Sequence, residues 1–127
     1  MRALVSAFCL SLLLAGVARA DSLNVRLVGH CGTPGQARGM DVVGDYAYVA
    51  DFDSGLRVIS VADPAHPVEV GYCDTPGRAC GVAVNGDKAY VADYGAGLRV
   101  ISVADPAHPV EVGYCDTSSS GGVPGTQ

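Results

Sequence analysis

The sequence has few basic residues, no closely spaced cysteine pairs and no apolar run long enough to span a membrane. Its 127 residues include 8 Lys and Arg against 13 Asp and Glu, a formal net charge of -5. A chain without a basic stripe cannot neutralise many phosphates, so we expect no nucleic-acid partner. None of the five cysteines forms a Cys-x-x-Cys pair, which argues against a zinc site. The composition fits one ordinary globular domain.

The first twenty residues have the pattern of a secretory signal peptide. Arg2 precedes an apolar run over residues 3–17, and the segment ends in small residues at Ala18 and Ala20. The run is about fifteen residues, whereas a membrane-spanning helix needs roughly 20. We predict a signal helix over 1–20, cleavage after Ala20, no membrane insertion after cleavage, and a secreted, periplasmic or cell-surface location. An uncleaved anchor is the alternative.

A period of 42 residues dominates the rest of the chain. The segment VADPAHPVEVGYCDT occurs at 61–75 and again, unchanged, at 103–117. When residues 34–75 are aligned with 76–117, 33 of the 42 positions are identical. A fixed period of this length is the signature of a repeat architecture, in which each unit stacks on its neighbours.

The repeated domain covers residues 21–117 and begins within a unit. Residues 25–33 form a partial unit, because four of its residues fall at the offsets of the later units: Val28, Gly29, Cys31 and Thr33. Residues 118–127 are rich in Ser and Gly and have no apolar period, which predicts a flexible tail. We therefore expect a partial unit, two full units and a tail.

Each unit predicts four short strands and no helix, because Val, Ile and Tyr dominate without a helical period. In the second unit we expect strands at 80–84, 88–93, 98–103 and 110–116. Turn residues separate them: Asn85-Gly86, Gly95 to Gly97, and Asp105 to Pro109.

The faces of these strands predict how they are covered. Both faces of 88–93 and 98–103 are apolar, which is typical of strands covered on both sides. In the fourth strand one side carries Val110, Val112 and Tyr114, and the other carries Glu111, Gly113 and Cys115. This alternation is expected of an outer strand that meets water. The predicted fold is all-β, with two four-stranded propeller-type blades and one leading strand over Val25 to Gly32.

Three segments resemble a known repeat family. They are YAYVAD at 46–51, GLRVISVADPAHPVEVG at 55–71 and GVAVNGDKAYVADYGAGLRVISV at 81–103, and they are similar to LVIVD repeats. The resemblance covers residues 25–117 and implies a β-propeller in a secreted or surface-exposed protein. It implies no catalytic residues. Propellers close with four to eight blades, so this chain departs from the family in its number of units.

Two blades alone leave apolar faces uncovered. Exposing about six side chains per face forfeits on the order of 10 kcal/mol. That is comparable with the whole stability of a domain, about 5 to 15 kcal/mol. We expect either a fragment of a longer propeller or, if the chain is complete, a homo-oligomeric ring in which three copies supply six blades. In both cases the leading strand would join a blade whose inner strands come from elsewhere.

Four cysteines follow the predicted cleavage site: Cys31, Cys73, Cys80 and Cys115. Three of them occupy equivalent positions on outer strands, which splay apart at the rim of a propeller beyond the reach of a disulfide. Only Cys73 with Cys80 is a plausible pair. The alternative is that all four are small packed residues.

Two motifs suggest chemistry but favour structural roles. The segment from Asp51 to Gly55 has the alternating carboxylates of a calcium loop, but the second unit has Gly95 in place of Asp53. We therefore expect Asp51 and Asp93 to accept hydrogen bonds from turn amides. One histidine per unit, His66 and His108, lies in the Asp-Pro turn, and a catalytic histidine is needed only once. The tyrosines are expected in the core or lining a channel: Tyr46, Tyr48 and Tyr90.

The sequence favours a non-enzymatic binding or scaffold module and assigns no catalytic, cofactor-binding or metal-binding residue. Near-identical units offer repeated equivalent contacts, which suits multivalent binding to a protein or glycan. An enzyme would need polar residues that differ between blades. The alternatives are part of a propeller hydrolase or lyase with its active site at the central channel, and a non-functional gene fragment.

Overall fold

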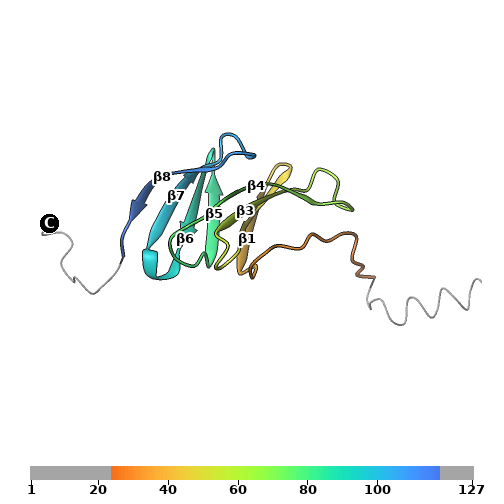
Figure 1. The fold of residues 1–127 in the computed structure, drawn as a ribbon. Coiled ribbons are helices and arrows are strands. Elements are labelled where there is room, and N and C mark those ends of the chain that lie inside the picture. Colours follow the sequence, from red (N-terminus) through yellow and green to blue (C-terminus); the bar gives the residue numbers. More distant parts are fainter. Residues whose placement is uncertain (1–23, 118–127) are drawn as a thin grey trace, which may run out of the picture.

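The computed structural model describes residues 24–117, which form two four-stranded antiparallel sheets (Figure 1). The first sheet contains β1 (Gly39–Val43), β2 (Tyr46–Ala50), β3 (Leu56–Ser60) and β4 (Val68–Cys73). The second contains β5 (Gly81–Asn85), β6 (Lys88–Ala92), β7 (Leu98–Ser102) and β8 (Val110–Cys115), with the short 3-10 turn η1 (Tyr94–Ala96) before β7. Each sheet is a meander in chain order. No helix in this part of the chain is long and apolar enough to cross a membrane.

The four strands predicted for each unit are confirmed, and in the second unit their ends agree to within one residue. The first hairpin of each unit turns at a glycine with positive φ, Gly44 at 60° and Gly86 at 62°. Because Asn85 pairs with Lys88, the two loop residues are Gly86 and Asp87, one position later than expected. A glycine with positive φ at the first loop position is typical of a type II′ turn.

The predicted leading strand is wrong, because residues 25–33 form no strand in the structure. A strand exists only when a neighbour pairs with its backbone, and the inner strands of this partial unit have no counterpart among the described residues. The predicted signal helix and cleavage site in 1–20 and the predicted tail over 118–127 lie outside the described residues.

A β-bulge changes the faces of the outer strands. The register between β7 and β8 shifts after Val100, which pairs with Gly113 while Ile101 pairs with Glu111. The residue between them, Val112, is therefore extra, and the alternation predicted for this strand fails at this point. The same shift occurs in the first sheet between Val58 and Ile59.

The main core lies between the two sheets. One face of the first sheet packs against one face of the second, and residues 74–80 form the connector between the sheets. The buried residues are Tyr48, Ala50, Leu56 and Val58 opposite Ala89, Val91, Ile101 and Val103, with Ala79 from the connector. A smaller cluster lies on the other face of the first sheet: Ala47, Val49 and Ile59, with Cys31 and Val61 packed against them. The inner strands of the first sheet are thus covered on both faces.

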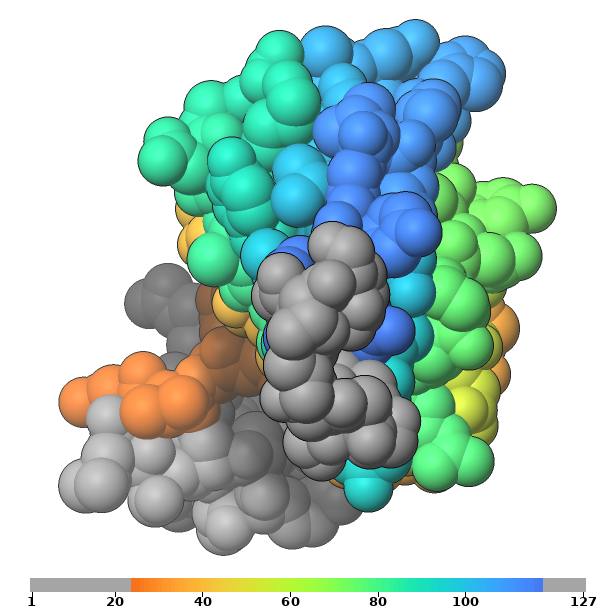
Figure 2. Space-filling view, turned by 90° about the vertical axis from the view of Figure 1, so that its left-hand side faces the viewer, coloured from red at the N-terminus to blue at the C-terminus, as the bar shows by residue number. Residues whose placement is uncertain are grey.

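The second sheet is covered on one face only, so the prediction that strands 88–93 and 98–103 are covered on both sides is wrong. Tyr90 and Leu98 are each 37% exposed, whereas their equivalents Tyr48 and Leu56 are 4% and 0% exposed. Figure 2 views the molecule from the side on which the second sheet lies. The two sheets therefore have the same sequence pattern but different surroundings.

Candidate functional site

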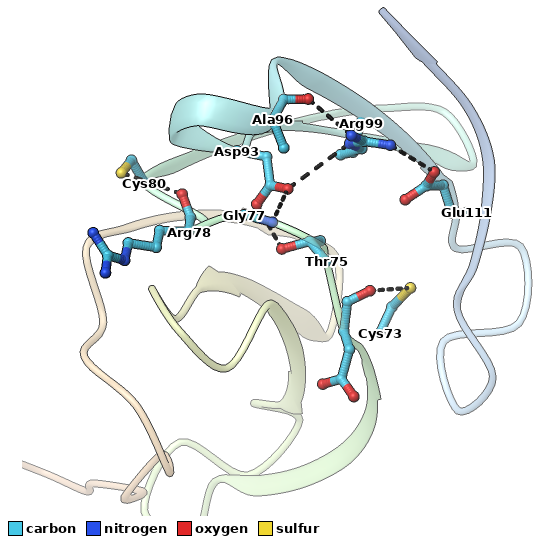
Figure 3. A network of polar contacts seen from close by, with 10 residues as sticks. Cys73, Thr75, Gly77, Arg78, Cys80, Asp93, Ala96, Arg99 and Glu111 are labelled. Atoms are coloured by element: carbon cyan, nitrogen blue, oxygen red, sulfur yellow. Dashed lines mark hydrogen bonds and ion pairs between the residues drawn. The ribbon is translucent and has the colours of Figure 1, made fainter. Parts of the chain in front are cut away.

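Asp93, the residue after β6, is a buried carboxylate that holds the connector between the sheets. It accepts a hydrogen bond from Thr75 Oγ1 at 2.5 Å and another from the Gly77 amide at 2.8 Å (Figure 3). Arg99 Nε lies 3.8 Å from Asp93 Oδ2, and Arg99 Nη2 donates to the Ala96 carbonyl at 3.0 Å. A buried carboxylate requires such partners because its desolvation is costly. Asp93 therefore fastens the connector to the second sheet.

Asp51 repeats this arrangement one unit earlier. It is fully buried and accepts hydrogen bonds from Thr33 Oγ1 at 2.7 Å and from the Gly35 amide at 2.8 Å. The predicted amide hydrogen bonds to both aspartates are confirmed, but the amides belong to the segment before each sheet rather than to the turn after the aspartate. The threonines were not predicted as partners, although a Thr stands 18 residues before the aspartate in both units.

The two carboxylates of the calcium-like segment have separate partners. Asp51 is hydrogen-bonded to Thr33 and Gly35, whereas the exposed Asp53 pairs with Arg78 Nε at 3.2 Å. Within residues 24–117, no three His, Cys, Asp or Glu side chains are grouped so that they could hold a metal ion.

Each outer strand carries a tyrosine and a glutamate that contact an arginine on the neighbouring strand. We call these groups the outer-strand triads: Arg57, Glu69 and Tyr72 in the first sheet, and Arg99, Glu111 and Tyr114 in the second. The Arg–Glu distance is 3.1 Å in the first and 3.2 Å in the second. The guanidinium carbon lies 4.5 Å and 4.6 Å from the centre of the tyrosine ring. A guanidinium over an aromatic ring is an attractive pairing, so each triad fixes its tyrosine.

The tyrosines of these triads remain open to solvent. Tyr72 is 54% exposed and Tyr114 is 66% exposed. The triads were not predicted from the sequence, because strict alternation places the tyrosine and the glutamate on opposite sides of the strand. The bulge described above brings them to the same arginine.

The histidines are held locally in their turns. His66 Nδ1 lies 2.9 Å from Asp63 Oδ2, and His108 Nδ1 lies 2.9 Å from Asp105 Oδ2. The hydrogen bond from His108 lowers the pKa of the Asp105 carboxyl. Each histidine side chain is 80% exposed. The two sites are equivalent, as a structural role in the Asp-Pro turn predicts.

A solvent-open hollow of about 430 Å³ lies where the connector meets the turns after β2 and β6. Its lining combines residues of both units: Asp53, Pro76, Gly77, Arg78, Tyr94, Gly95 and Ala96. Beside it, the guanidinium carbons of Arg38 and Arg78 lie 4.0 Å and 5.4 Å from the centre of the Phe52 ring. The Phe52 backbone exchanges hydrogen bonds with Ala79 at 2.9 and 3.0 Å. Arg38, Phe52 and Asp53 all differ from their second-unit equivalents, so this junction has its own side chains.

The cysteines of the described chain are free thiols, and the suggested Cys73–Cys80 disulfide is absent. Cys31 packs against the smaller cluster, Cys73 packs against the main core, and Cys115 is exposed. Burial raises the pKa of the Cys73 thiol. Equivalent cysteines thus differ because their surroundings differ.

The tyrosines expected in the core divide in the same way. Tyr48 is buried, with its ring centre 6.5 Å from that of Tyr46. Burial, with a smaller contribution from Tyr46, raises the pKa of the Tyr48 phenol. Tyr90 lies on the open face of the second sheet, so of the two expected positions, core or channel lining, the core is confirmed for Tyr48 and does not hold for Tyr90, while Tyr46 is partly buried against the main core.

Both units match one family model. Residues 34–75 and 76–117 each match the LVIVD repeat. The chain belongs to the LVIVD-repeat family. In this family member the matched boundaries fall just after Thr33 and just after Thr75, so each buried aspartate binds a threonine of the unit before its own. Among curated proteins, no sequence matches the chain.

Proposed function

We propose that the chain is a secreted or cell-surface repeat protein of the β-propeller type that acts as a non-enzymatic binding or scaffold module. The observation that carries the proposal is the repetition of the outer-strand triads. Their distances agree to 0.1 Å between the sheets, and both tyrosines are more than half exposed. Each blade therefore presents the same rigid aromatic group to a ligand.

The repetition favours a partner with a repeating surface, either a protein or a glycan. Two equivalent contacts on one rigid body make the second binding event intramolecular, which raises avidity without a new kind of contact. Extracellular action is proposed from the signal-like pattern of residues 1–20.

The test uses labelled protein of residues 21–127 on arrays of polysaccharide fragments and of peptides, displayed at high and low density. We expect retention on a densely displayed probe. Replacing either tyrosine, Tyr72→Ala or Tyr114→Ala, should lower the avidity about a hundredfold, because one of two contacts is lost. The double variant should not be retained. The matched control is Tyr94→Ala, because this exposed tyrosine lies on neither outer strand.

Two results would contradict the proposal: retention on no probe, or a double variant that is retained as well as the unchanged protein. A double variant equal to one single variant would show that only one tyrosine binds, which also removes the multivalent mechanism.

A second candidate function is part of a propeller hydrolase or lyase. The observation that favours it is the hollow at the junction, because residues that differ between the units gather there. Asp53 and Arg78 would be its polar groups, and they already pair with each other at 3.2 Å. Turnover of an ester, glycoside or uronate substrate that is lost in Asp53→Asn but kept in Tyr72→Ala would establish the enzyme in place of the binding module.

A further inference from the structure

Three glycines at the same position of the repeat differ in what lies against them. A β-carbon on Gly71 would overlap the Pro106 carbonyl oxygen, in the Asp-Pro turn of the second unit. A β-carbon on Gly29 would overlap the equivalent Pro64 oxygen, in the turn of the first unit. A β-carbon on Gly113 would meet nothing within 4 Å. The first two glycines are thus each seated against the turn of the following unit, and among the described residues no turn lies against the third.

A second pair of glycines shows the same asymmetry. A β-carbon on Gly39 would lie 3.1 Å from the Cys80 carbonyl oxygen and 3.2 Å from Gly81 Cα, where the second sheet approaches the first. The equivalent β-carbon on Gly81 would meet nothing within 4 Å. Cys115 is likewise exposed where Cys73 packs against the main core. Three independent positions of the second unit therefore lack the neighbour that their first-unit equivalents have.

The open face of the second sheet is apolar, and the surface that would cover it already exists elsewhere in the chain. Tyr90, Ala92, Leu98 and Val100 are the equivalents of Tyr48, Ala50, Leu56 and Val58, which are buried against the second sheet. The surface that buries them includes Ala89, Val91 and Ile101. The first sheet carries the equivalent surface in Ala47, Val49 and Ile59. The chain thus contains both halves of a second junction of the same kind.

We propose that the open face of the second sheet is a docking surface for the first sheet of another copy of this chain. In the docked pair, the Pro64 turn of one copy lies against Gly113 of the other, as Pro106 lies against Gly71 within one chain. Because residues 24–117 offer one surface of each type, the contact is head-to-tail and continues until a ring closes.

The segment 25–33 must leave its place for this docking to occur. Gly29 and Cys31 occupy on the first sheet the positions that Gly71 and Cys73 occupy on the second. The outer strand β8 of the incoming copy would need the same positions. The segment cannot instead replace β8, because Leu27 and His30 stand where β8 carries Glu111 and Tyr114, the partners of Arg99. Residues 25–33 therefore compete with docking.

The test measures the accessibility of the Cys115 thiol. Protein of residues 21–127 is treated with iodoacetamide over a range of protein concentrations, and modification of each cysteine is located by peptide mass spectrometry. We expect modification of Cys115 to slow as the concentration rises until it matches that of Cys73. Cys73 is the internal reference, since its packing lies within one chain. Equal reactivity of Cys115 at every concentration would overturn the proposal.

A matched pair of glycine variants separates docking from folding. Gly113→Ala places a methyl group where the Pro64 oxygen of the second copy would lie, so protection of Cys115 should be lost. Gly95→Ala is the control, because a β-carbon there also meets nothing within 4 Å, and its first-unit equivalent, Asp53, already carries a β-carbon at the junction between the two sheets. Both variants should melt like the unchanged protein at high dilution. Protection retained in Gly113→Ala, or lost equally in Gly95→Ala, would contradict the proposal.

The competing segment is tested with Gly29→Ala, in which the new methyl group would overlap the Pro64 oxygen. Loosening residues 25–33 should shift protection of Cys115 to lower protein concentration. An unchanged concentration dependence would exclude the competition. A loss of the β-sheet circular dichroism signal would also exclude it, because the segment would then be an essential part of the first sheet. The outer-strand tyrosines are unchanged in all these variants, so the results are independent of the proposed binding function.

Discussion

The buried aspartates are the residues on which the junctions between units depend most. Replacing Asp93 with Ala leaves the Thr75 hydroxyl and the Gly77 amide without their acceptor. Unsatisfied buried donors cost about 1 to 3 kcal/mol each, so we predict a loss of roughly 3 kcal/mol in the free energy of unfolding, measured by urea denaturation. The control is Asp63→Ala, which removes an exposed turn contact and should cost less than about 1 kcal/mol. Equal losses in the two variants would contradict this role for Asp93.

A pH prediction follows from the buried Tyr48. Its phenol has a raised pKa in the folded chain, so the folded state holds this proton more tightly than the unfolded state. The contribution of Tyr48 to stability is therefore complete below pH about 10, the ordinary phenol pKa, and is lost as the pH rises above it. In urea titrations, Tyr48→Phe should weaken this alkaline loss, whereas Tyr94→Phe, at an exposed position, should not. Identical pH profiles for the unchanged protein and Tyr48→Phe would refute the assignment.

At the scale of elements, the hairpins depend on glycine for backbone conformation alone. Gly86 has a φ of 62° and no heavy atom near its missing β-carbon, so Gly86→Ala introduces strain without a clash. The left-handed region costs other residues roughly 1 to 2 kcal/mol, and we predict a loss of that size in the free energy of unfolding. Gly95→Ala, also in open space but without a positive φ, should leave stability unchanged. A neutral Gly86→Ala would show that the hairpin can turn in another way.

The strands were predictable because glycine and proline mark each turn, and a hairpin turn is a local property of the sequence. The outer-strand triads were not, because they depend on the bulge at Val112, which alternation alone does not reveal. The partners of the aspartates were only half predictable. That an aspartate in a turn accepts hydrogen bonds from backbone amides follows from its residue type. That Asp93 accepts from the Gly77 amide, and not from a nearer turn amide, depends on how the connector crosses the sheet.

The partial unit shows a different limit of the sequence pattern. Residues 25–33 share four residues with the end of a full unit and still form no strand. The 42-residue period shows which kind of strand a segment could pair with. The segment forms a strand only when that pairing strand is present. The same segment nevertheless lies beside the next unit, because Gly29 lies against the Pro64 turn as Gly71 lies against the Pro106 turn.

At the scale of the whole molecule, the open face of the second sheet has an energetic consequence. Burying a fully exposed large side chain is worth roughly 1.5 to 3 kcal/mol, and Tyr90 and Leu98, each 37% exposed, would gain about a third of that each. A domain is stable by only about 5 to 15 kcal/mol, so such gains summed over the open face would raise its stability noticeably. We predict that Val100→Asp prevents association, because docking would bury a charge without a partner. Association of Val100→Asp at the same concentration as the unchanged protein would contradict the proposed face.

Export of the chain is a separate prediction at this scale. The small residues at Ala18 and Ala20 follow an apolar run too short to span a membrane, so we expect signal peptidase to cleave after Ala20. Mass spectrometry of protein recovered from the secreted fraction should find Asp21 at the N-terminus. Exported protein that begins at Met1 would contradict the prediction and favour the uncleaved anchor.

The central claim is that the two sheets are consecutive blades with a third position open beside the second. Sedimentation velocity on residues 21–127, over a wide range of protein concentrations, tests it most directly. We predict a discrete oligomer at high concentration, most simply three copies in a closed ring of six sheets, which dissociates on dilution and in Gly113→Ala. A well-folded monomer at every concentration would contradict the claim.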